Sequence, residues 1–291
     1  MPAFGNSGPW QKYVAYGIGQ EQLSGMAYMT GYTNDGPMKS GINHGDPITG
    51  SHAAGVLLAA LRYRRRTGEG MFIDVSQQES AVSLIGGPLL AYQMTGQEPE
   101  RIGNRSPNIA PHNCYPCQGE DRWVTIAIKS DQEWELLAES MEAEHLSKDP
   151  RFSTNESRLA NEDDLDALIK EWTSNKDAYE ITEKLQYHGI SAMPVFRGPD
   201  LLENPHYRDR STFVEVNHPQ VGPKMYPGMP WKMSETPGLV HWPAPTLGEH
   251  NYQIYHELLG LSETEIVRLE KSGIIGTKPT GSRIILSLIH I

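Results

Sequence analysis

The stretch NHGDPITGSHAAGVLLAALRYRRRTGEG, residues 43–70, places one aspartate, Asp46, directly before a proline and a long apolar run. Proline is favoured at the first position of a helix, because its missing N–H would have no partner there. Aspartate is among the best residues just before that position, because its carboxylate accepts free N–H groups of the first turn. We therefore predict that Asp46 caps a helix from Pro47 to Arg66. The apolar side chains leave this helix almost no polar face, which predicts that it is buried.

A second interpretation of Asp46 stays open. A carboxylate at a helix N-terminus is held rigidly, is kept ionised by the helix dipole, and is able to face a cleft. These are the properties that a carboxylate nucleophile needs. The local sequence alone favours the plain cap, since this is the commonest use of such an aspartate.

The composition is that of an ordinary globular protein. The 291 residues are enough for one large or two modest domains. The net charge of −11 argues against a general nucleic-acid or membrane-surface binder. The longest apolar run, residues 53–61, is far too short to span a bilayer. We therefore expect neither a nucleic-acid partner nor a membrane-spanning segment.

The two cysteines, Cys114 and Cys117, form a single C-x-x-C pair. Such a pair can be a redox centre or half of a zinc site. No second pair exists to complete a four-cysteine zinc site, and a strand follows the pair instead of a helix that would lower a thiol pKa. We predict that both thiols pack as small apolar groups and that no metal is bound. The low cysteine count predicts a reducing, cytoplasmic location.

The pattern along the chain predicts a mixture of helices and strands. Residues 71–76 alternate as a short strand, and residues 77–96 form a second long helix that is interrupted at its paired glycines. Residues 104–200 combine strands at 122–128 and 191–196 with amphipathic helices.

Two capping boxes predict helix starts, at Ser130–Glu133 and at Ser262–Glu265. Frequent prolines between residues 200 and 250 predict an irregular path. The sequence contains no P-loop, G-x-S-x-G, H-E-x-x-H or glycine-rich dinucleotide turn. The common nucleotide-binding and hydrolase motifs therefore do not explain its function.

Several separated motifs, taken together, resemble one family. They are GNSGPW, YVAYG, GD before HAAGVLLAALRYRRRTGEG, IDVSQQES, PERIGNRSPNIAPHNCYPC, DRWVTIAI and PTLGEHN, in this order over residues 1–275. The set is similar to the family III CoA-transferases, which include carnitine-related and oxalate-related transferases and an alpha-methylacyl-CoA racemase branch. The resemblance implies an α/β fold, with part of a Rossmann-like CoA-transferase domain and a small α+β domain.

The resemblance also implies a division of the chain. Its segments are the remainder of the Rossmann-like large domain with the GD aspartate at 1–77, a linker helix at 78–103, the small α+β domain at 104–200 and a C-terminal return segment at 201–275. Residues 276–291 end in LSLIHI, which matches a translated sequencing adaptor, so we expect a non-native tail. Family members carry a long N-terminal half of the large domain ahead of the first motif, so we expect an N-terminally truncated fragment that is not a competent enzyme alone.

In the family, the aspartate of the GD motif is the catalytic nucleophile, and this position is Asp46. The resemblance thus implies transfer of coenzyme A between an acyl-CoA donor and a carboxylic acid, through an aspartyl anhydride and an aspartyl-CoA thioester. It places Tyr16 near the thioester, and Gly103 and Asn104 in a mobile loop over the site. His44 is a candidate to orient the nucleophile. The residue types alone allow an ordinary hinge at Gly103 and Asn104 equally well and a packed Tyr16 at least as well, and a loop histidine such as His44 is more often simply solvated.

Two departures from the family pattern bear on the activity. The racemase branch uses a histidine as a second acid or base, and residues 16–22 contain none, which favours transfer. Some transferases carry a glutamate directly after the tyrosine, where this chain has Gly17, and Glu21 is close but not matched. An alpha-methylacyl-CoA racemase or epimerase remains one alternative, and a non-catalytic CoA-binding or oligomerisation remnant remains another.

The resemblance implies acyl-CoA and carboxylic acid substrates, no tightly bound cofactor and an interlocked homodimer. Exchange of the proton at the alpha carbon of an acyl-CoA, without transfer, would favour the racemase alternative.

Overall fold

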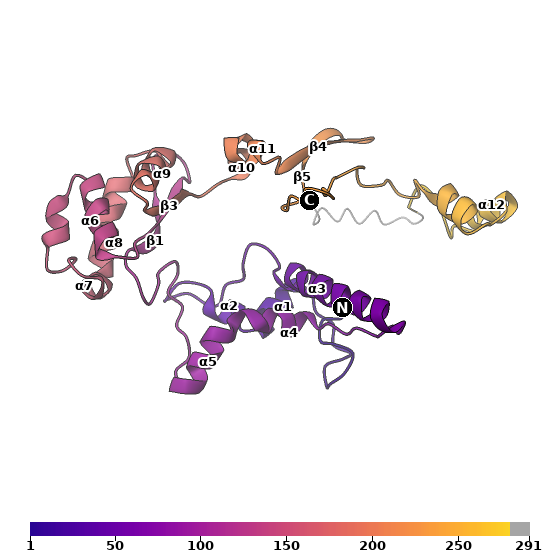
Figure 1. Cartoon of the computed structure of the whole chain (residues 1–291), viewed down its shortest axis with the longest axis horizontal. Coiled ribbons are helices and arrows are strands. Elements are labelled where there is room, and N and C mark those ends of the chain that lie inside the picture. Colours follow the sequence, from indigo (N-terminus) through magenta and orange to yellow (C-terminus); the bar gives the residue numbers. More distant parts are fainter. Residues whose placement is uncertain (280–291) are drawn as a thin grey trace. The chain divides into compact units, whose positions relative to one another are not determined.

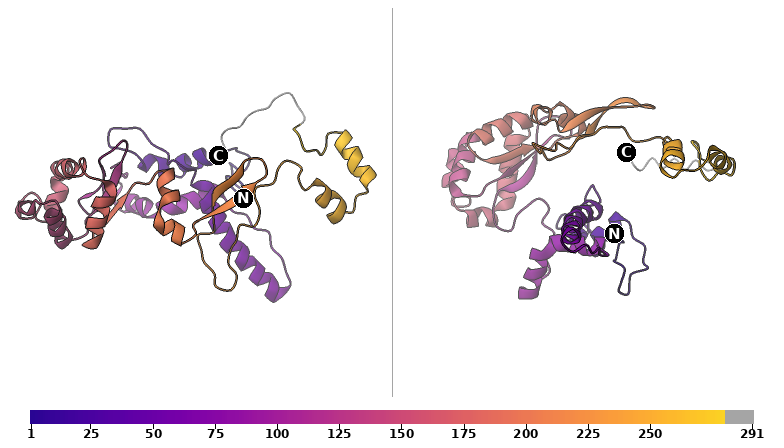
Figure 2. Two further views of the ribbon diagram at one scale, coloured as in Figure 1. Left: turned by 90° about the horizontal axis from the view of Figure 1, so that it is seen from above. Right: turned by 45° about the vertical axis from the view of Figure 1, so that its right-hand side comes forward.

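The computed structural model describes residues 1–279, so the predicted tail at 276–291 lies mostly outside the described residues (Figure 1). The chain divides into two compact units, residues 1–195 and the part that begins at Phe196. In the first unit, a series of helices and loops comes first, and a region of helices around a small sheet follows (Figure 2). The fold is thus a mixture of helix and strand, as predicted.

The N-terminal part of the first unit consists of helices joined by extended segments. These helices are α1 (Gly17–Leu23), α2 (Met26–Met29), α3 (Gly45–Thr67), α4 (Gln77–Val82), the 3-10 helix η1 (Ser83–Ile85) and α5 (Gly86–Thr95). The two predicted long helices are confirmed, the first as α3 and the second as α4, η1 and α5. The second is interrupted just before its paired glycines, where the helix tightens into the 3-10 turn.

The start of α3 differs from the prediction. The helix begins at Gly45, its N-cap residue is His44, and Asp46 lies in the first turn instead of at the cap. The backbone N–H of His44 donates to the carboxylate of Glu21 at 2.8 Å, a residue of α1. The N–H of Ile48, which a cap at Asp46 would accept, donates to the carbonyl of His44 at 3.1 Å, so the helix starts two residues before Pro47 without Asp46 as its cap. The cap assignment for Asp46 is therefore wrong.

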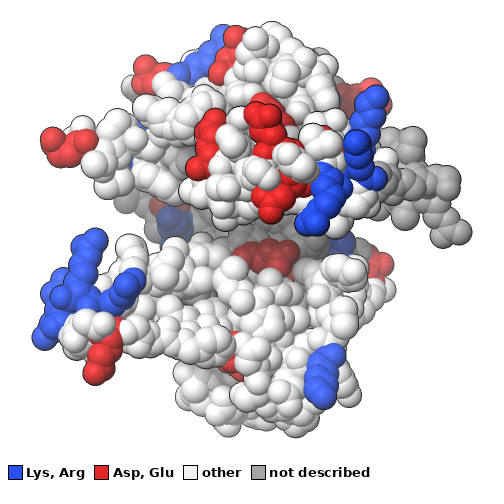
Figure 3. Space-filling view, turned by 90° about the vertical axis from the view of Figure 1, so that its right-hand side faces the viewer, with Lys and Arg blue, Asp and Glu red and all other residues white. Residues whose placement is uncertain are grey.

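The apolar side of α3 is open to solvent among the described residues. Within the helix, Gly45 and Thr49 are buried, whereas Leu57 is 52% exposed and Leu58 is 69% exposed. Figure 3 shows broad uncharged surface between separate groups of charged side chains. The predicted burial of α3 is thus not achieved by residues 1–279, and the helix presents an apolar surface.

Residues 71–76, predicted as a strand, are extended but pair with no strand of the described chain. A strand is stabilised by the backbone hydrogen bonds of a neighbour, and no neighbouring strand lies beside this segment in residues 1–279. The strand prediction is therefore not met in this structure. The segment instead ends at Ser76, whose hydroxyl caps α4 by accepting the N–H of Glu79 at 3.3 Å.

The second part of the first unit has its own sheet and core. Its elements are β1 (His112–Pro116), β2 (Trp123–Ala127), α6 (Asp131–Ser140), η2 (Glu144–Lys148), α7 (Asn155–Ala160), α8 (Glu162–Thr173), α9 (Ala178–Tyr187) and β3 (Ser191–Pro194). The strands form an antiparallel sheet in the order β1-β2-β3, with Tyr115 opposite Val124 and Ile126 opposite Ala192. Trp134 and Leu165, both fully buried, belong to the hydrophobic core between this sheet and the helices. The predicted strands and helices of this region are confirmed, and β1, which contains Cys114, was not predicted.

The second unit is more ordered than its prolines suggested. Its elements are α10 (Gly198–Glu203), α11 (Pro205–Asp209), the antiparallel hairpin of β4 (Phe213–His218) and β5 (Gly222–Pro227), the π-helical segment η3 (Gln253–Leu258) and α12 (Glu263–Lys271). The hairpin corrects the predicted irregular path. The capping box at Ser262 and Glu265 is confirmed at the start of α12. At α6 the Ser130 cap is confirmed, but the Glu133 carboxylate accepts from the N–H of Lys129 instead of closing the box.

Candidate active site

The carboxylate of Asp46 lies exposed in the first turn of α3. The side-chain amide of Gln77, the first residue of α4, donates to its Oδ1 atom at 2.6 Å. A short hydrogen bond of this kind is typical of a donor that faces an ionised acceptor. The carboxylate also lies at the N-terminal end of α3, the end of a helix that attracts negatively charged groups.

A buried carboxylate, Glu21, anchors the loop that leads into α3. Glu21 is 1% exposed and accepts hydrogen bonds from the hydroxyl of Ser40 at 2.8 Å and from the backbone N–H of His44 at 2.8 Å. Burial raises the pKa of the Glu21 carboxyl, but these donors outweigh it, and the pKa lies below its ordinary value. Glu21 is therefore an ionised anchor that fixes where α3 begins and hence where Asp46 stands.

A second buried side chain, Gln20, connects α1 with α4. Its amide donates to Oε1 of Gln77 at 2.5 Å, and the residue is 1% exposed. Gln20 lies directly against Gly45, because a β-carbon at position 45 would overlap Oε1 of Gln20 and lie 3.0 Å from its Cδ. Glycine is thus required there by close packing, and it lets α1, α3 and α4 meet next to Asp46.

His44 stands two residues before Asp46 in sequence, but its ring contacts Ser40 and Glu21. Nδ1 of His44 is 2.9 Å from the hydroxyl of Ser40 and 3.4 Å from the carboxylate of Glu21. The side chain that contacts the Asp46 carboxylate is therefore Gln77, and the predicted orienting role of His44 has no direct hydrogen bond behind it in residues 1–279.

Tyr16 immediately precedes α1 and is 80% exposed. The next residue, Gly17, packs so closely on Asn43 that a β-carbon would overlap that side chain. Tyr16 is therefore held close to the loop that carries His44 into α3, with its ring in solvent. This placement agrees with a surface that a substrate could contact, which stays a prediction.

Gly103 and Asn104 contact a different loop. The N–H of Gly103 donates to the carbonyl of Gly31 at 2.8 Å, and the amide of Asn104 donates to the hydroxyl of Tyr32 at 3.3 Å. Gly103 has a φ of +64°, and a β-carbon there would lie 2.5 Å from the ring of Tyr32, so a glycine is required. Asn104 helps to line a cavity of about 330 Å³, and the contacts of the described residues do not connect it to Asp46.

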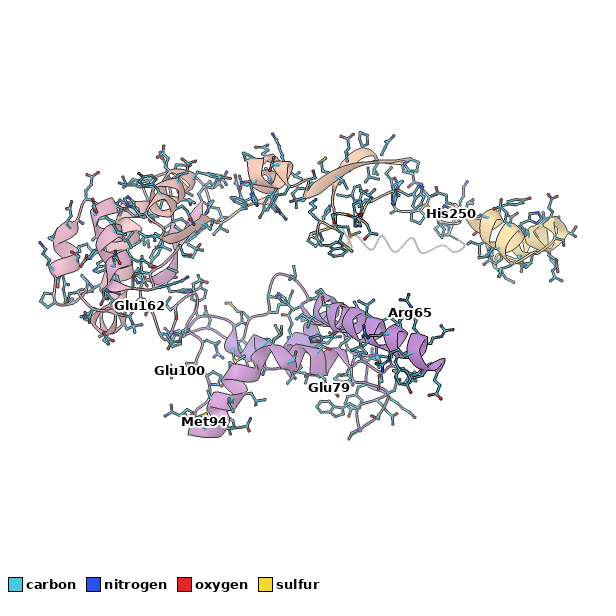
Figure 4. All side chains as sticks on the ribbon, viewed as in Figure 1. Arg65, Glu79, Met94, Glu100, Glu162 and His250 are labelled. Atoms are coloured by element: carbon cyan, nitrogen blue, oxygen red, sulfur yellow. The ribbon has the colours of Figure 1, made fainter. Side chains whose placement is uncertain are left out.

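The three arginines Arg64, Arg65 and Arg66 lie in the last turn of α3, and Figure 4 labels Arg65 there. Arg65 stands nineteen positions after Asp46 in the helix, which corresponds to about 29 Å at 1.5 Å per residue. The arginines therefore lie far from the Asp46 carboxylate.

The thiols of the C-x-x-C pair are free cysteines. Burial raises the pKa of Cys114, and burial with smaller effects of Asp177 and Cys114 raises the pKa of Cys117 to about 11. A high pKa leaves the thiol protonated and poorly nucleophilic. No cluster of His, Cys, Asp and Glu suited to a metal occurs within residues 1–279. No helix of that part is long and apolar enough to cross a membrane.

Sequence reasoning did not single out Gln20 and Gln77. The two residues stand 57 positions apart, and Gln77 stands 31 positions from Asp46, so no local spacing signals their contact. A usable signal is the polar QQ pair at the point where the apolar alternation of residues 71–76 ends.

Comparisons with known proteins identify the family of this chain. The sequence profile described as CoA-transferase family III matches residues 1–251. The succinyl-CoA–D-citramalate CoA-transferase of Chloroflexus aurantiacus is 33% identical over 275 residues, which cover 94% of this chain and 68% of the relative. The formyl-CoA:oxalate CoA-transferase of Streptomyces coelicolor is 30% identical over 283 residues, which cover 92% of this chain and 68% of the relative.

The structural comparison identifies a solved structure with a similar fold. A CAIB/BAIF family protein from Brucella suis matches with a TM-score of 0.79 at 28% identity, over 88% of this chain and 66% of that chain. The chain thus spans about two thirds of the length of these proteins. The sequence profile, the enzymes at 30–33% identity and the shared fold together establish that this chain belongs to CoA-transferase family III.

Proposed function

We propose that this chain carries the nucleophile of a CoA-transferase, and that the nucleophile is the carboxylate of Asp46. The observation that supports this role most directly is that other groups accept the backbone N–H donors at the start of α3. The N–H of Ile48, which a capping Asp46 would accept, donates instead to the carbonyl of His44, so Asp46 stays exposed with only Gln77 as its protein partner in the described chain. A rigid, ionised and accessible carboxylate is suited to nucleophilic attack.

The reaction proceeds by exchange at the Asp46 carboxylate. Oδ2 attacks the carbonyl carbon of the donor thioester, the C–S bond breaks, and CoA leaves as a thiolate, which gives a mixed anhydride. The thiolate then attacks the Asp46 carbonyl carbon and expels the donor carboxylate, which gives an aspartyl-CoA thioester. The acceptor carboxylate displaces CoA to form a second anhydride. Finally the thiolate attacks the acceptor carbonyl, which releases acceptor-CoA and the free carboxylate.

We propose a dicarboxylic acid as the acceptor. The two relatives described above are named for transfer to D-citramalate and to oxalate, and both acceptors are dicarboxylic acids. Racemisation is disfavoured, because it needs a free acid or base beside the substrate. Glu21, the acidic residue of the segment 16–22, is buried and has its carboxylate occupied by donors.

The test of the nucleophile is Asp46→Ala in the catalytically active protein, assayed with succinyl-CoA as donor and a panel of dicarboxylic acids. Transfer should be abolished, while stability falls by only about 1 kcal/mol, the scale of a helix-terminal charge. The matched control is Asp164→Ala, which removes another exposed first-turn carboxylate, in α8, and should leave turnover unchanged. Hydroxylamine trapping should label the peptide that contains Asp46.

Substantial turnover by folded Asp46→Ala, or trapping at another peptide, would refute the covalent role. Exchange of the alpha proton of the acyl-CoA without transfer would instead support a racemase.

We further propose that this chain functions together with additional large-domain structure and as a homodimer. Within residues 1–103, the buried apolar side chains are those of Ala27 and Ala81, whereas the leucines of α3 are open to solvent. An apolar face of this kind needs a covering surface. The chain by itself should therefore associate in solution and bind CoA weakly.

Light scattering with and without Leu58→Glu tests this proposal, because a charge at this 69%-exposed position should reduce association. Leu202→Glu, at an exposed leucine of α10, is the control. A monodisperse chain that binds CoA with micromolar affinity in calorimetric titration would contradict the proposal.

A further inference from the structure

The two oxygens of the Asp46 carboxylate are not equivalent. Oδ1 accepts the amide of Gln77 at 2.6 Å. Oδ2 has no protein donor among residues 1–279. Oδ2 is therefore the atom that is free to attack. Oδ1 is then the atom that remains a carbonyl oxygen once Asp46 is acylated.

The direction of the Gln77 amide follows from its neighbours. An ionised carboxylate only accepts hydrogen bonds, so the group of Gln77 that faces Asp46 is its NH₂. Oε1 of Gln77 then points to Gln20 and accepts its NH₂ at 2.5 Å. This order leaves Oε1 of Gln20 buried and without a hydrogen-bond partner in the described chain. A buried acceptor without a partner is costly, and here it results from the direction of the chain, in which Gln20 donates to Gln77 and Gln77 donates to Asp46.

We propose that Gln77 is a catalytic residue that stabilises the oxyanion formed on Oδ1 of Asp46, and that Gln20 is the positioning residue that holds it. This proposal rests on the function proposed above. When CoA thiolate attacks the anhydride at the Asp46 carbonyl carbon, a C–S bond forms and the carbonyl electron pair moves to Oδ1. The pair returns as the bond from carbon to Oδ2 breaks and the donor carboxylate leaves.

The same oxyanion forms a second time in each turnover. The acceptor carboxylate adds to the carbonyl carbon of the aspartyl-CoA thioester, and the electron pair again moves to Oδ1. It returns as the C–S bond breaks and the CoA thiolate leaves. The NH₂ of Gln77 already points at this atom, so it can stabilise the developing charge without reorganisation.

The first step of the reaction differs. When Asp46 attacks the donor thioester, the negative charge develops on the oxygen of the donor acyl group and not on Oδ1, the atom to which Gln77 donates. Loss of the Gln77 amide should therefore leave the formation of the first anhydride within about tenfold of its rate and slow the two later attacks. Removal of one oxyanion donor slows such steps by about 10²–10³-fold.

The experiment mixes the active protein with succinyl-CoA alone, stops the reaction at short times with acid, and measures the mass of the denatured chain. The wild type should carry CoA as a covalent adduct. Gln77→Leu should instead accumulate the succinyl adduct, with CoA released as a free thiol that a thiol reagent detects. Gln93→Leu is the matched control, since Gln93 is exposed on α5 and its amide contacts only the carbonyl of Leu89 in its own helix. It should give the wild-type adduct.

Two further variants separate this role from a structural one. Gln77→Asn keeps an amide but shortens it, and should recover part of the CoA adduct. Gln20→Leu leaves the amide of Gln77 in place but removes the side chain that holds it. It should raise the proportion of the succinyl adduct over the CoA adduct, and the CoA adduct should form less slowly than in Gln77→Leu. Folding of each variant is checked by circular dichroism, and the adduct ratio can be measured on whatever fraction folds.

The outcomes distinguish the two proposals. A CoA adduct that forms in Gln77→Leu at the wild-type rate would overturn the role of Gln77 and leave the Asp46 nucleophile intact. The absence of any adduct on the Asp46 peptide in the wild type would overturn the nucleophile itself.

Discussion

A methyl group added at Gly45 tests the packing that places Asp46. A β-carbon at this position would overlap Oε1 of Gln20 and lie 3.0 Å from Cδ and 3.2 Å from Cβ of the same side chain. Gln20 is 1% exposed, so its side chain has no solvent to swing into. The substitution Gly45→Ala should therefore push α3 away from α1 and break the hydrogen bond between Gln20 and Gln77.

The expected cost is that of overpacking a filled site, about 1–3 kcal/mol. The control is Gly55→Ala in the same helix, where a β-carbon would meet nothing within 4 Å. Alanine is the better helix former, so the control should gain about 0.5–1 kcal/mol. The two alanine variants should thus differ in free energy of unfolding by about 1.5–4 kcal/mol, although the chemical change is identical.

Urea unfolding of both variants, followed by circular dichroism, measures this difference through the transition midpoints. In the active protein, Gly45→Ala should also lower the transfer rate, because it disturbs Gln77. A Gly45→Ala chain that unfolds at the same urea concentration as Gly55→Ala, or at a higher one, would show that Gln20 does not pack on α3 as described.

Two other predictions follow from the titrating groups. The lowered pKa of Glu21 means that its stabilising contribution is complete above its ordinary value of 4.5 and is lost as the pH falls through the lower folded value. Glu21→Gln should therefore be less stable than the wild type at neutral pH, and the gap should close in acid; a gap that is constant with pH would contradict the anchor role. Replacing both Cys114 and Cys117 with serine should leave transfer near the wild-type rate, since the protonated thiols take no part in the aspartyl route. Iodoacetamide should label the native thiols slowly at neutral pH, and a large loss of activity in a folded double variant, or stoichiometric zinc in the protein, would show this expectation to be wrong.

The elements that the sequence predicted correctly are those with local signals. Helices α8, α9 and α12 show apolar residues at helical spacing, and the Ser262–Glu265 capping box marks the start of α12. The long helix α3 was predicted to within two residues at its start and one at its end.

The elements that were missed depend on contacts between distant segments. The hairpin of β4 and β5 contains prolines at 223 and 227 and alternates weakly, so its pairing is visible only in the fold. Residues 71–76 alternate well but have no partner strand in the described chain. The cap of α3 was misassigned for the same reason, since the group that accepts the N–H of His44 comes from Glu21, 23 residues earlier.

The residues of the candidate site were likewise predicted only in part. The resemblance to a family singled out Asp46, and its role stays a proposal until the variants are assayed. Gln77 and Gln20 could not be found in this way, because their link to Asp46 arises only when α1, α3 and α4 pack together.

The hydrogen bond from the N–H of His44 to the carboxylate of Glu21 bears on when, during folding, the candidate site forms. A chain that is still emerging from the ribosome, or one that has lost its fold, lacks both this contact and the hydrogen bond from Gln77 to Asp46. The chemistry proposed for Asp46 would therefore be confined to chains in which α1, α3 and α4 have packed together.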